Sequence, residues 1–461
     1  MESDVRVVEA IPYFIEAVAR TPLKFGGVVM DRLDYAQVRV EVETRGGKRG
    51  VGWGGMFLSD VWAFPDERVP HAQRLAAMRE VTRRFARLLV EQNTFGHPIA
   101  LYHQVEDGLR ELTAATSAEL GLAVPLPFLG ALVSASPADA ALHDAFGVAN
   151  GISTYDGYGP EFMGHDLSGY LGAEFKGKYP SDYLRKCYEP KVPVFHLVGG
   201  LDKLRRSEVD ESDPKDGLPN SLEEWVERDG LFCLKVKLRG IDLEWDIARM
   251  IEVAAIGREA RQRIGEHRLH FTADTNEMCD TPQYMVDFLE RVRERDPQTF
   301  DDILYVEQPT ERDLSARRFD MRPVARLKPV LVDESLTGLA DFELALGLGW
   351  SGIALKACKC QSAELVLAAK AEHMGIPYAI QDLTNPALAL LQSVGLAARL
   401  HPIMGVEANS HQFYPAFSEP EAAVHPGIFR RQDGVLDTRT LQGPGLGYQM
   451  GKISRPLPAP G

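Results

Sequence analysis

The sequence predicts an α/β protein in which a barrel of parallel strands follows an α+β segment. Three observations carry this prediction. Strands precede helices in the first 130 residues or so, eight short apolar runs alternate with amphipathic segments after about residue 190, and no G-x-G-x-x-G follows a run. Near-continuous apolar runs are typical of parallel strands covered on both faces, and their alternation with helices favours a (β/α)8-type barrel. An open doubly wound sheet is the structural alternative.

The N-terminal segment is predicted to contain a hairpin and two helices. Residues 34–45 alternate between apolar and charged side chains, and Gly46-Gly47 then turns the chain, which predicts a half-buried antiparallel hairpin. Residues 71–92 and 103–121 are predicted to be helices. The side chains on which these predictions rest are Val38, Val40 and Val42 for the hairpin face, and Leu75, Met78, Phe85 and Leu89 for a helical stripe.

The eight apolar runs predict the barrel strands, and the segments between them carry helix signals. Thr281-Pro282 is a helix start, residues 244–263 have an apolar stripe, and Gly375 follows residues 361–374 as a helix-ending glycine. Residues 154–190 and 201–219 interrupt the pattern and are predicted to be either active-site loops or solvated insertions. The runs are Val192–Val198, Phe232–Leu238, Leu269–Ala273, Ile303–Val306, Val330–Val332, Ile353–Leu355, Tyr378–Ile380 and Ile403–Val406.

The composition excludes several classes of protein. Of the 461 residues, 45% are hydrophobic and 25% are charged, which is typical of globular chains. The net charge of −15 argues against nucleic-acid binding, which needs clustered lysine and arginine. We find no apolar run long enough for a membrane span and no secretory signal at the acidic start. The five cysteines are few and scattered, and Cys358-Lys359-Cys360 is a lone pair, so we expect a cytoplasmic protein without a zinc site.

Charged residues stand where five of the apolar runs end. Their spacings of 37, 33, 26 and 23 residues, counted from Lys237, are each about one βα unit. Successive strands are neighbours around a barrel, so these side chains are expected to converge at its C-terminal mouth, where charged residues are usually functional. They are Lys235 and Lys237, Asp274, Glu307, Asp333 and Lys356.

Three converging carboxylates would repel one another unless a cation lies among them. All-oxygen ligation favours Mg²⁺ over zinc, so Asp274, Glu307 and Asp333 are candidate metal ligands. Lysines on either side suit proton transfer, which makes Lys237 and Lys356 the candidate acid and base. Further candidates are Lys235 and Glu407 as catalytic residues, and Asn276, Glu334 and Lys359 as residues that support the ligands.

These strand ends resemble the enolase superfamily, and within it the mandelate racemase/muconate lactonizing enzyme group. The resemblance covers nearly the whole chain and implies a modified TIM barrel, (β/α)7β, over residues 136–414. It also implies an α+β capping domain built from residues 1–135 and the C-terminal tail, 415–461. The matching stretches are Lys235-Val-Lys237, Asp274-Thr-Asn276, Val306-Glu307-Gln-Pro309, Asp333-Glu-Ser335 and Lys356, with Ala138–Gly147 similar to the segment that enters the barrel.

The resemblance also implies roles for single residues. Asp274, Glu307 and Asp333 would bind Mg²⁺, while Lys237 and Lys356 would exchange protons with the substrate and Lys235 would support them. Paired lysines are more similar to the muconate lactonizing branch than to the mandelate racemase branch, which has an Asp on the sixth strand and a His on the seventh.

The chain departs from the family pattern in three places. It is longer than typical members, and Cys360-Gln361 replaces the usual glycine pair after Lys356. The eighth strand reads Glu407-Ala-Asn409 where dipeptide epimerases have Asp-x-Asp to hold an amine. We therefore expect a reaction other than dipeptide epimerisation.

The expected function is a Mg²⁺-dependent lyase or isomerase that abstracts the proton α to a substrate carboxylate and forms an enediolate. Racemisation or epimerisation, sugar-acid dehydration, cycloisomerisation and succinylbenzoate synthesis all stay open. The alternatives are a barrel aldolase with a Schiff-base lysine and a non-catalytic metal-binding relative. We expect a small carboxylic acid as substrate, a homo-oligomer, and neither membrane nor nucleic acid as partner. Substrate specificity is assigned to loops around Thr21–Met30 and Trp53–Pro65, with Trp53 and Phe57 as the named candidates.

Overall fold

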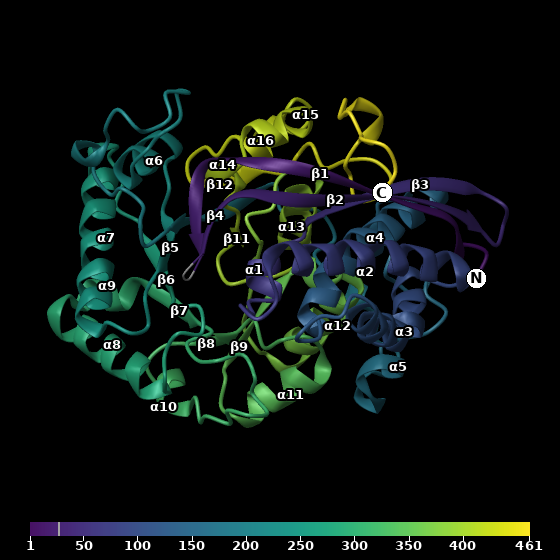
Figure 1. Cartoon of the computed structure of the whole chain (residues 1–461), viewed down its shortest axis with the longest axis horizontal. Coiled ribbons are helices and arrows are strands. Elements are labelled where there is room, and N and C mark those ends of the chain that lie inside the picture. Colours follow the sequence, from purple (N-terminus) through teal and green to yellow (C-terminus); the bar gives the residue numbers. More distant parts are fainter. Residues whose placement is uncertain (26–27) are drawn as a thin grey trace.

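A computed structural model describes residues 1–25 and 28–461, in which a three-stranded antiparallel sheet lies beside a closed barrel of eight parallel strands (Figure 1). The fold class expected from the sequence is confirmed. The buried core of the N-terminal part includes Ala357, Cys358, Ala387 and Tyr414 of the barrel. The two parts therefore share a packed apolar interface. The exact domain boundaries at residues 135 and 414 stay a prediction.

The N-terminal sheet confirms the predicted hairpin and extends it. The strands β1 (Val5–Phe25), β2 (Val28–Thr44) and β3 (Arg49–Phe57) pair in this order, each antiparallel to the next. Val38, Val40 and Val42 are fully buried on one face of β2. Gly47 adopts a φ of 83° in the turn to β3, a conformation that glycine enters without strain.

The two stretches predicted as specificity loops are largely regular structure, which corrects the prediction. In the first, β1 continues to Phe25 and β2 begins at Val28, while Gly26 and Gly27 lie outside the described residues. The second contains the end of β3 and the short helix α1 (Asp60–Ala63). Pairing with β2 makes residues 53–57 a strand, although the glycines there interrupt the alternation of side chains on which strand prediction depends.

Three long helices follow the sheet: α2 (His71–Glu91), α3 (Pro98–Glu119) and α4 (Phe128–Asn150). The first two were predicted. The helix α3 begins earlier than expected because the His97 side chain accepts the backbone N–H of Ile99, and proline is favourable at the first helical position. The helix α4 has no polar stripe, since nearly all of its residues are buried between the sheet and the barrel.

Glycines on β3 allow α4 to lie directly against the strand. A Cβ atom added at Gly52 would lie 2.1 Å from the backbone nitrogen of Ala145 and 2.3 Å from the carbonyl oxygen of Ala141. We expect Gly52→Ala to lower the free energy of unfolding by about 3 kcal/mol or more, because helix and strand must separate to admit the methyl group. Urea unfolding measures the change, and Gly164→Ala, which meets nothing within 4 Å, is the control. Equal stability of both variants would contradict this packing.

The eight predicted barrel strands are all present and parallel, and β11 closes the barrel on β4. Most of these strands begin and end within one or two residues of the corresponding apolar run, whereas the eighth strand is shorter than its run. The strands are β4 (Lys191–Val198), β5 (Cys233–Lys237), β6 (His270–Asp274), β7 (Ile303–Glu307), β8 (Val330–Val332), β9 (Gly352–Lys356), β10 (Tyr378–Gln381) and β11 (Val406–Glu407).

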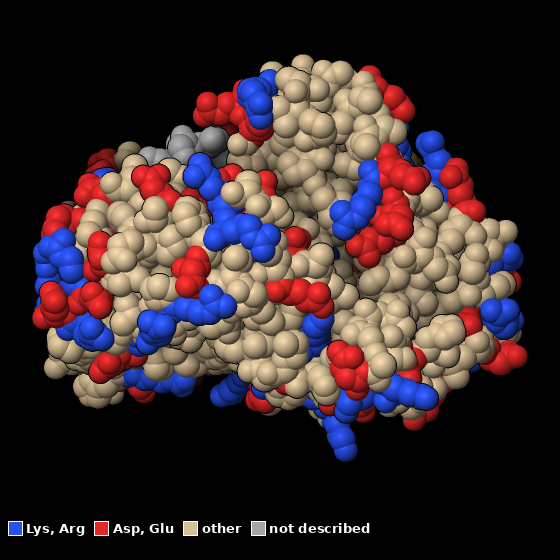
Figure 2. Space-filling view, turned by 90° about the horizontal axis from the view of Figure 1, so that it is seen from below, with Lys and Arg blue, Asp and Glu red and all other residues tan. Residues whose placement is uncertain are grey.

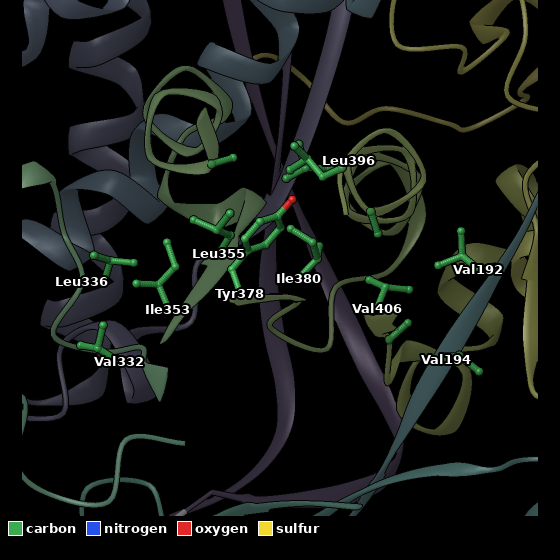
Figure 3. Close-up of a cluster of buried hydrophobic side chains, with 14 of the residues drawn as sticks. Val192, Val194, Val332, Leu336, Ile353, Leu355, Tyr378, Ile380, Leu396 and Val406 are labelled. Atoms are coloured by element: carbon green, nitrogen blue, oxygen red, sulfur yellow. The ribbon is translucent and has the colours of Figure 1, made fainter. Parts of the chain in front are cut away.

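Helices cover the outside of the barrel. Apolar side chains from alternate strand positions, among them Ile353, Leu355, Ile380 and Val406, form the buried cluster drawn in Figure 3 together with Leu396 of a covering helix. The helices are α6 (Leu222–Asp229), α7 (Leu243–Arg263), α8 (Pro282–Arg295), α9 (Pro297–Asp302), α10 (Arg322–Ala325), α11 (Leu339–Gly347), α12 (Gln361–Met374) and α13 (Ala387–Arg399).

The insertions and the tail are held by specific contacts. Residues 154–190 contain the short helix α5 (Ser168–Leu171) and three 3-10 turns. The loop 201–219 follows β4, and Arg20 of β1 binds it through Asp216 and the carbonyl oxygen of Leu218. The helix α14 (Ser410–Phe413) follows β11, and the tail contains α15 (Glu419–Ala422), α16 (Pro426–Phe429) and β12 (Val435–Asp437), which adds to the barrel beside β4.

The surface seen in Figure 2 carries acidic and basic side chains that alternate over the face rather than gather in regions of one sign. In the described part of the chain, no helix is long and apolar enough to cross a membrane.

Candidate active site

The register of the barrel strands brings the predicted residues to one level. Lys237 of β5 lies opposite Asp274 of β6, and Asp274 lies opposite Glu307 of β7. On the far side, Lys356 of β9 lies opposite Gln381 of β10. Side chains alternate along a strand, so residues at matching positions project from the same face. These residues therefore point together into the C-terminal mouth of the barrel.

Lys235 joins carboxylates from three other strands. Its Nζ lies 2.9 Å from both carboxylate oxygens of Glu307, 2.7 Å from Oε2 of Glu407 and 3.1 Å from Oδ2 of Asp274. Glu407 stands on β11 and Glu307 on β7, neither of which pairs with β5, so the contacts cross the barrel interior. Lys235 is 2% exposed. The sequence had placed Lys235 and Glu407 near the site, and the structure joins them directly.

The other two lysines pair with the outer carboxylates. Lys237 forms an ion pair with Oδ2 of Asp274. On the opposite side, Lys356 Nζ lies 2.6 Å from Oδ2 of Asp333, and Lys359 donates to the backbone oxygen of Asp333 at 2.7 Å. Lys237 and Lys356 stand on the second and sixth of eight strands, so they approach the centre of the mouth from opposite sides.

Polar side chains around this cluster orient its carboxylates. The backbone N–H of Asn276 donates to Asp274 at 2.8 Å, and Gln381 Nε2 donates to Glu307 at 2.5 Å. Asn409 Nδ2 donates to Glu407 at 2.7 Å. The supporting positions predicted for Asn276 and Lys359 thus coincide with direct contacts to the carboxylates, and Gln381 and Asn409 add two contacts that the sequence did not predict.

Burial and charge act against each other on these acids. Burial raises the pKa of Asp274, but the ammonium groups of Lys237 and Lys235 outweigh it and lower the pKa to about 2. Burial raises the pKa of Glu307 more than Lys235 lowers it, and the nearby carboxylates of Asp274 and Asp333 also raise it, to about 7. Burial, together with Asp333 and Glu277, raises the pKa of Glu334 to about 8. The mouth therefore holds carboxyl groups whose charged forms disfavour one another.

Within residues 1–25 and 28–461, no three His, Cys, Asp or Glu side chains are already arranged to hold a metal ion. Lysine ammonium groups lie among the three candidate ligands instead. The oxygen donors themselves, one carboxylate from each of three adjacent strands, have the chemistry that Mg²⁺ prefers. The three carboxylates are therefore of the right chemical kind for Mg²⁺. In this structure their side chains are arranged around lysine ammonium groups.

Trp62 lies in the stretch Trp53–Pro65 that was predicted to face the site, but the sequence did not single it out. It comes from α1 in the N-terminal part, its Nε1 donates to Glu334 at 2.9 Å, and Lys356 Nζ lies 4.7 Å from the centre of its ring. No local pattern marks this residue, because the contact exists only when the N-terminal part covers the barrel mouth. Asp382, directly after β10, is a second such residue: it is buried, and its pKa is raised well above the usual value by burial and then by Glu407.

The two residues named for substrate specificity lie elsewhere on β3. Trp53 stacks on Tyr13 with ring centres 6.3 Å apart, and its backbone N–H donates to Asp144 of α4. Phe57 is fully buried between Tyr35 and Tyr414. Their part in substrate selection stays a prediction.

We expect Trp62→Phe to destabilise the protein by about 1–3 kcal/mol, because the buried Glu334 carboxyl group loses its hydrogen-bond donor. Urea unfolding measures the effect. The control is Trp350→Phe, since Nε1 of the buried Trp350 has no hydrogen-bond partner among the described residues. If both variants lost equal stability, the loss would come from packing and the hydrogen bond to Glu334 would contribute nothing.

Comparisons with known proteins agree on one fold. The sequence profile of the family described as Enolase C-terminal domain-like matches residues 218–452, more than half of the chain. Among solved structures, an enolase from Bradyrhizobium complexed with magnesium and mandelic acid is similar at 15% identity and a TM-score of 0.59, with 100% of each chain covered. A muconate lactonizing enzyme from Mucobacterium Smegmatis complexed with muconolactone is similar at 17% identity and a TM-score of 0.58, with 96% of each covered.

The L-Ala-D/L-Glu epimerase from Bacillus subtilis is similar at 18% identity and a TM-score of 0.57, covering 87% of this chain and 89% of that one. No curated protein sequence matches this chain. At such identities the solved structures establish the fold alone, and the family profile establishes the relationship.

Proposed function

This chain belongs to the enolase superfamily, in its mandelate racemase/muconate lactonizing enzyme group, and on that premise we propose that it is a Mg²⁺-dependent enzyme that removes the proton α to the carboxylate of a small acid. The observation that carries the proposal is the buried cluster at the barrel mouth. Three carboxylates from adjacent strands stand between Lys237 and Lys356, which approach from opposite sides.

Asp274, Glu307 and Asp333 are the residues that would hold Mg²⁺. Burial and neighbouring carboxylates raise the pKa of Glu307 to about 7 and that of Glu334 to about 8, and a divalent cation would offset the repulsion that disfavours their charged forms. Bound Mg²⁺ would supply electrostatic stabilisation of the negative charge that develops on the substrate carboxylate.

The position of each lysine in the cluster supports a different role. Lys237 is 16% exposed and stands at the edge of the cluster, where its Nζ could accept or deliver a proton at the substrate. Lys356 would do the same from the opposite face, or hold charge there without exchanging a proton. Lys235 contacts Glu307, Glu407 and Asp274 at once, so it is a positioning residue that holds these carboxylates around its ammonium group.

Water exclusion falls to the N-terminal part. Trp62 covers Lys356 from above, and Arg312 joins the two parts by donating to the backbone oxygen of Trp62 at 2.9 Å and to Glu277 at 2.8 Å. Covering of the Lys356 side of the mouth would limit the access of water to the carbanionic form of the substrate.

A screen for exchange of the α-proton with solvent deuterium tests the proposal. A panel of carboxylic acids is incubated in deuterated buffer with the protein, with and without Mg²⁺, and read by NMR. We expect Mg²⁺-dependent exchange of at least one acid. Mg²⁺ binding without any exchange would favour a non-catalytic relative. Trapping of a lysine adduct by borohydride with a carbonyl substrate would favour the aldolase.

A further inference from the structure

A recess opens beside Lys237, and its walls differ in chemistry from the carboxylate cluster behind it. The recess has a volume of about 460 Å³, within the range of roughly 300–1,000 Å³ that is usual for small-molecule pockets. The loops after β4, β5 and β6 and the start of α7 form it. In Figure 1 these strands lie where the hairpin of β1 and β2 reaches across the barrel.

Apolar side chains on this recess are unusually exposed. Leu201 is 66% exposed, Ile241 68% and Met278 46%, and all three line the same recess, with Trp245 beside them. Single exposed apolar side chains are normal on protein surfaces, but several such side chains around one cavity indicate a binding site for an apolar group. A ligand that covers these three side chains would remove the exposed apolar surface from water.

The charged groups of the recess are cationic. They are Lys237 at its inner end and Arg239 at its rim, and none of the described residues that line it is acidic. The Arg239 guanidinium lies 3.9 Å from the centre of the Trp245 ring. Its contact with Asp242 is 3.4 Å long between two half-exposed side chains, so that ion pair is weak. Lys237 is already ion-paired with Asp274, so Arg239 is the cation that an anionic ligand would meet at the rim of the recess.

The walls of the recess are held in place before any ligand binds. The buried Asp246 carboxylate accepts the backbone N–H groups of Arg239 and Gly240 at 2.7 and 2.9 Å. Gly240 has a φ of 70°, and a Cβ there would lie 2.8 Å from Met278, so the loops after β5 and β6 are in close contact. Asn276 has a φ of 46° and also binds Asp274, which ties the recess wall to the carboxylate cluster.

We propose that this recess holds the apolar substituent of the substrate, so that the enzyme acts on a carboxylic acid with an alkyl or aryl group rather than on a polyhydroxylated sugar acid. The inference rests on the function proposed above, because Lys237 would then stand between the recess and the reacting carbon. The hydroxyl groups of a sugar acid would face Leu201, Ile241 and Met278, which offer no hydrogen-bond partners, and desolvation without compensation is unfavourable.

The test compares two 2-hydroxy acids that differ in the rest of the molecule, 2-hydroxy-4-phenylbutanoate and D-gluconate. With the full chain and Mg²⁺, α-proton exchange is followed by NMR, and binding of 4-phenylbutanoate, which lacks the 2-hydroxyl group, is followed by calorimetry. The variants are Ile241→Ser and Met278→Ser. The control is Ile264→Ser, a 39% exposed side chain that follows α7 and does not line the recess.

We expect exchange of the phenyl acid in preference to gluconate. Each recess variant should raise KM for the phenyl acid and weaken 4-phenylbutanoate binding about tenfold, as loss of one apolar contact does, while the control changes neither. Preferential exchange of gluconate would overturn the inference and leave the proposed function standing. Absent exchange of every acid, with 4-phenylbutanoate binding still weakened by the recess variants, would contradict the function and support the recess.

Two further results would overturn the inference. One is 4-phenylbutanoate binding that neither recess variant weakens. The other is an equal loss of activity toward every acid, which would mean that the recess seats the β1–β2 hairpin instead of the substrate. The hairpin is the competing occupant because Arg20, Thr21 and Pro22 line an adjoining cavity together with Leu201.

Discussion

Replacing Asp333 with asparagine is expected to lower Mg²⁺-dependent turnover roughly a thousandfold or more and to weaken Mg²⁺ binding. Metal ions contribute several kcal/mol to stabilising developing charge, and each 1.36 kcal/mol or so is a factor of ten in rate. Asp274→Asn and Glu307→Gln should have the same effect, because each of the three carboxylates comes from a different strand and none can replace another. Calorimetric titration with Mg²⁺ measures binding directly and does not depend on knowing the substrate.

Loss of one buried charge also leaves its lysine partners uncompensated, so stability must be separated from metal binding. Asp229→Asn is the matched control. Asp229 is equally buried and ion-paired, at 2.7 Å from Arg431, but it lies at the end of α6, outside the barrel mouth. We expect it to lose stability and to keep Mg²⁺ affinity. Unchanged Mg²⁺ affinity in all three mouth variants would rule out these residues as the metal site.

Replacing Lys237 or Lys356 with alanine is expected to reduce turnover by about 10²–10⁴-fold, the usual contribution of a general acid or base. The pattern of loss reveals the reaction. In a racemase, Lys237→Ala should stop α-proton exchange of one enantiomer and Lys356→Ala that of the other, because the two lysines face the substrate from opposite sides. In a dehydratase or cycloisomerase, one variant should lose exchange while the other mainly loses rate.

Lys370→Ala is the control for these lysine variants. Lys370 is also largely buried and pairs with a carboxylate, Glu343, at 2.6 Å, but it lies on α12 outside the barrel mouth. We expect its turnover to match that of the unmodified protein. Wild-type turnover in both Lys237→Ala and Lys356→Ala would mean that neither lysine moves the proton, and the mechanism would have to be abandoned.

The barrel was predictable because its signals are local. Each strand is a short apolar run followed by a helix-forming segment. Because side chains alternate along a strand, residues two apart point to the same face, and this identifies the last side chain that points into the barrel. Lys235 and Lys237, two apart on β5, were placed on one face by this rule alone. The one-unit spacing of Asp274, Glu307 and Asp333 then predicted adjacency, since consecutive strands of a barrel are neighbours.

The N-terminal part was less predictable for two physical reasons. Glycines on β3 remove the side chains whose alternation would mark a strand, although they are there because α4 approaches the backbone. The helix α4 is buried on nearly all sides, so it lacks the polar stripe by which an amphipathic helix is recognised. In both cases, packing against a neighbouring element removed the sequence pattern from which a strand or a helix is predicted.

By itself, the sequence brought the lysines and carboxylates at the ends of the strands to the barrel mouth, because strand order and side-chain alternation are properties of the chain. Tertiary structure alone decided how those side chains are paired and what covers them. Lys235 reaches Glu407 across the barrel interior, and Trp62 binds Glu334 from a segment 272 residues away. These contacts form only when the barrel closes and the N-terminal part packs against it. No local sequence pattern predicts them. The exposed recess at Leu201, Ile241 and Met278 also depends on tertiary structure, because the conformations of the loops after β4, β5 and β6 place these side chains around one cavity.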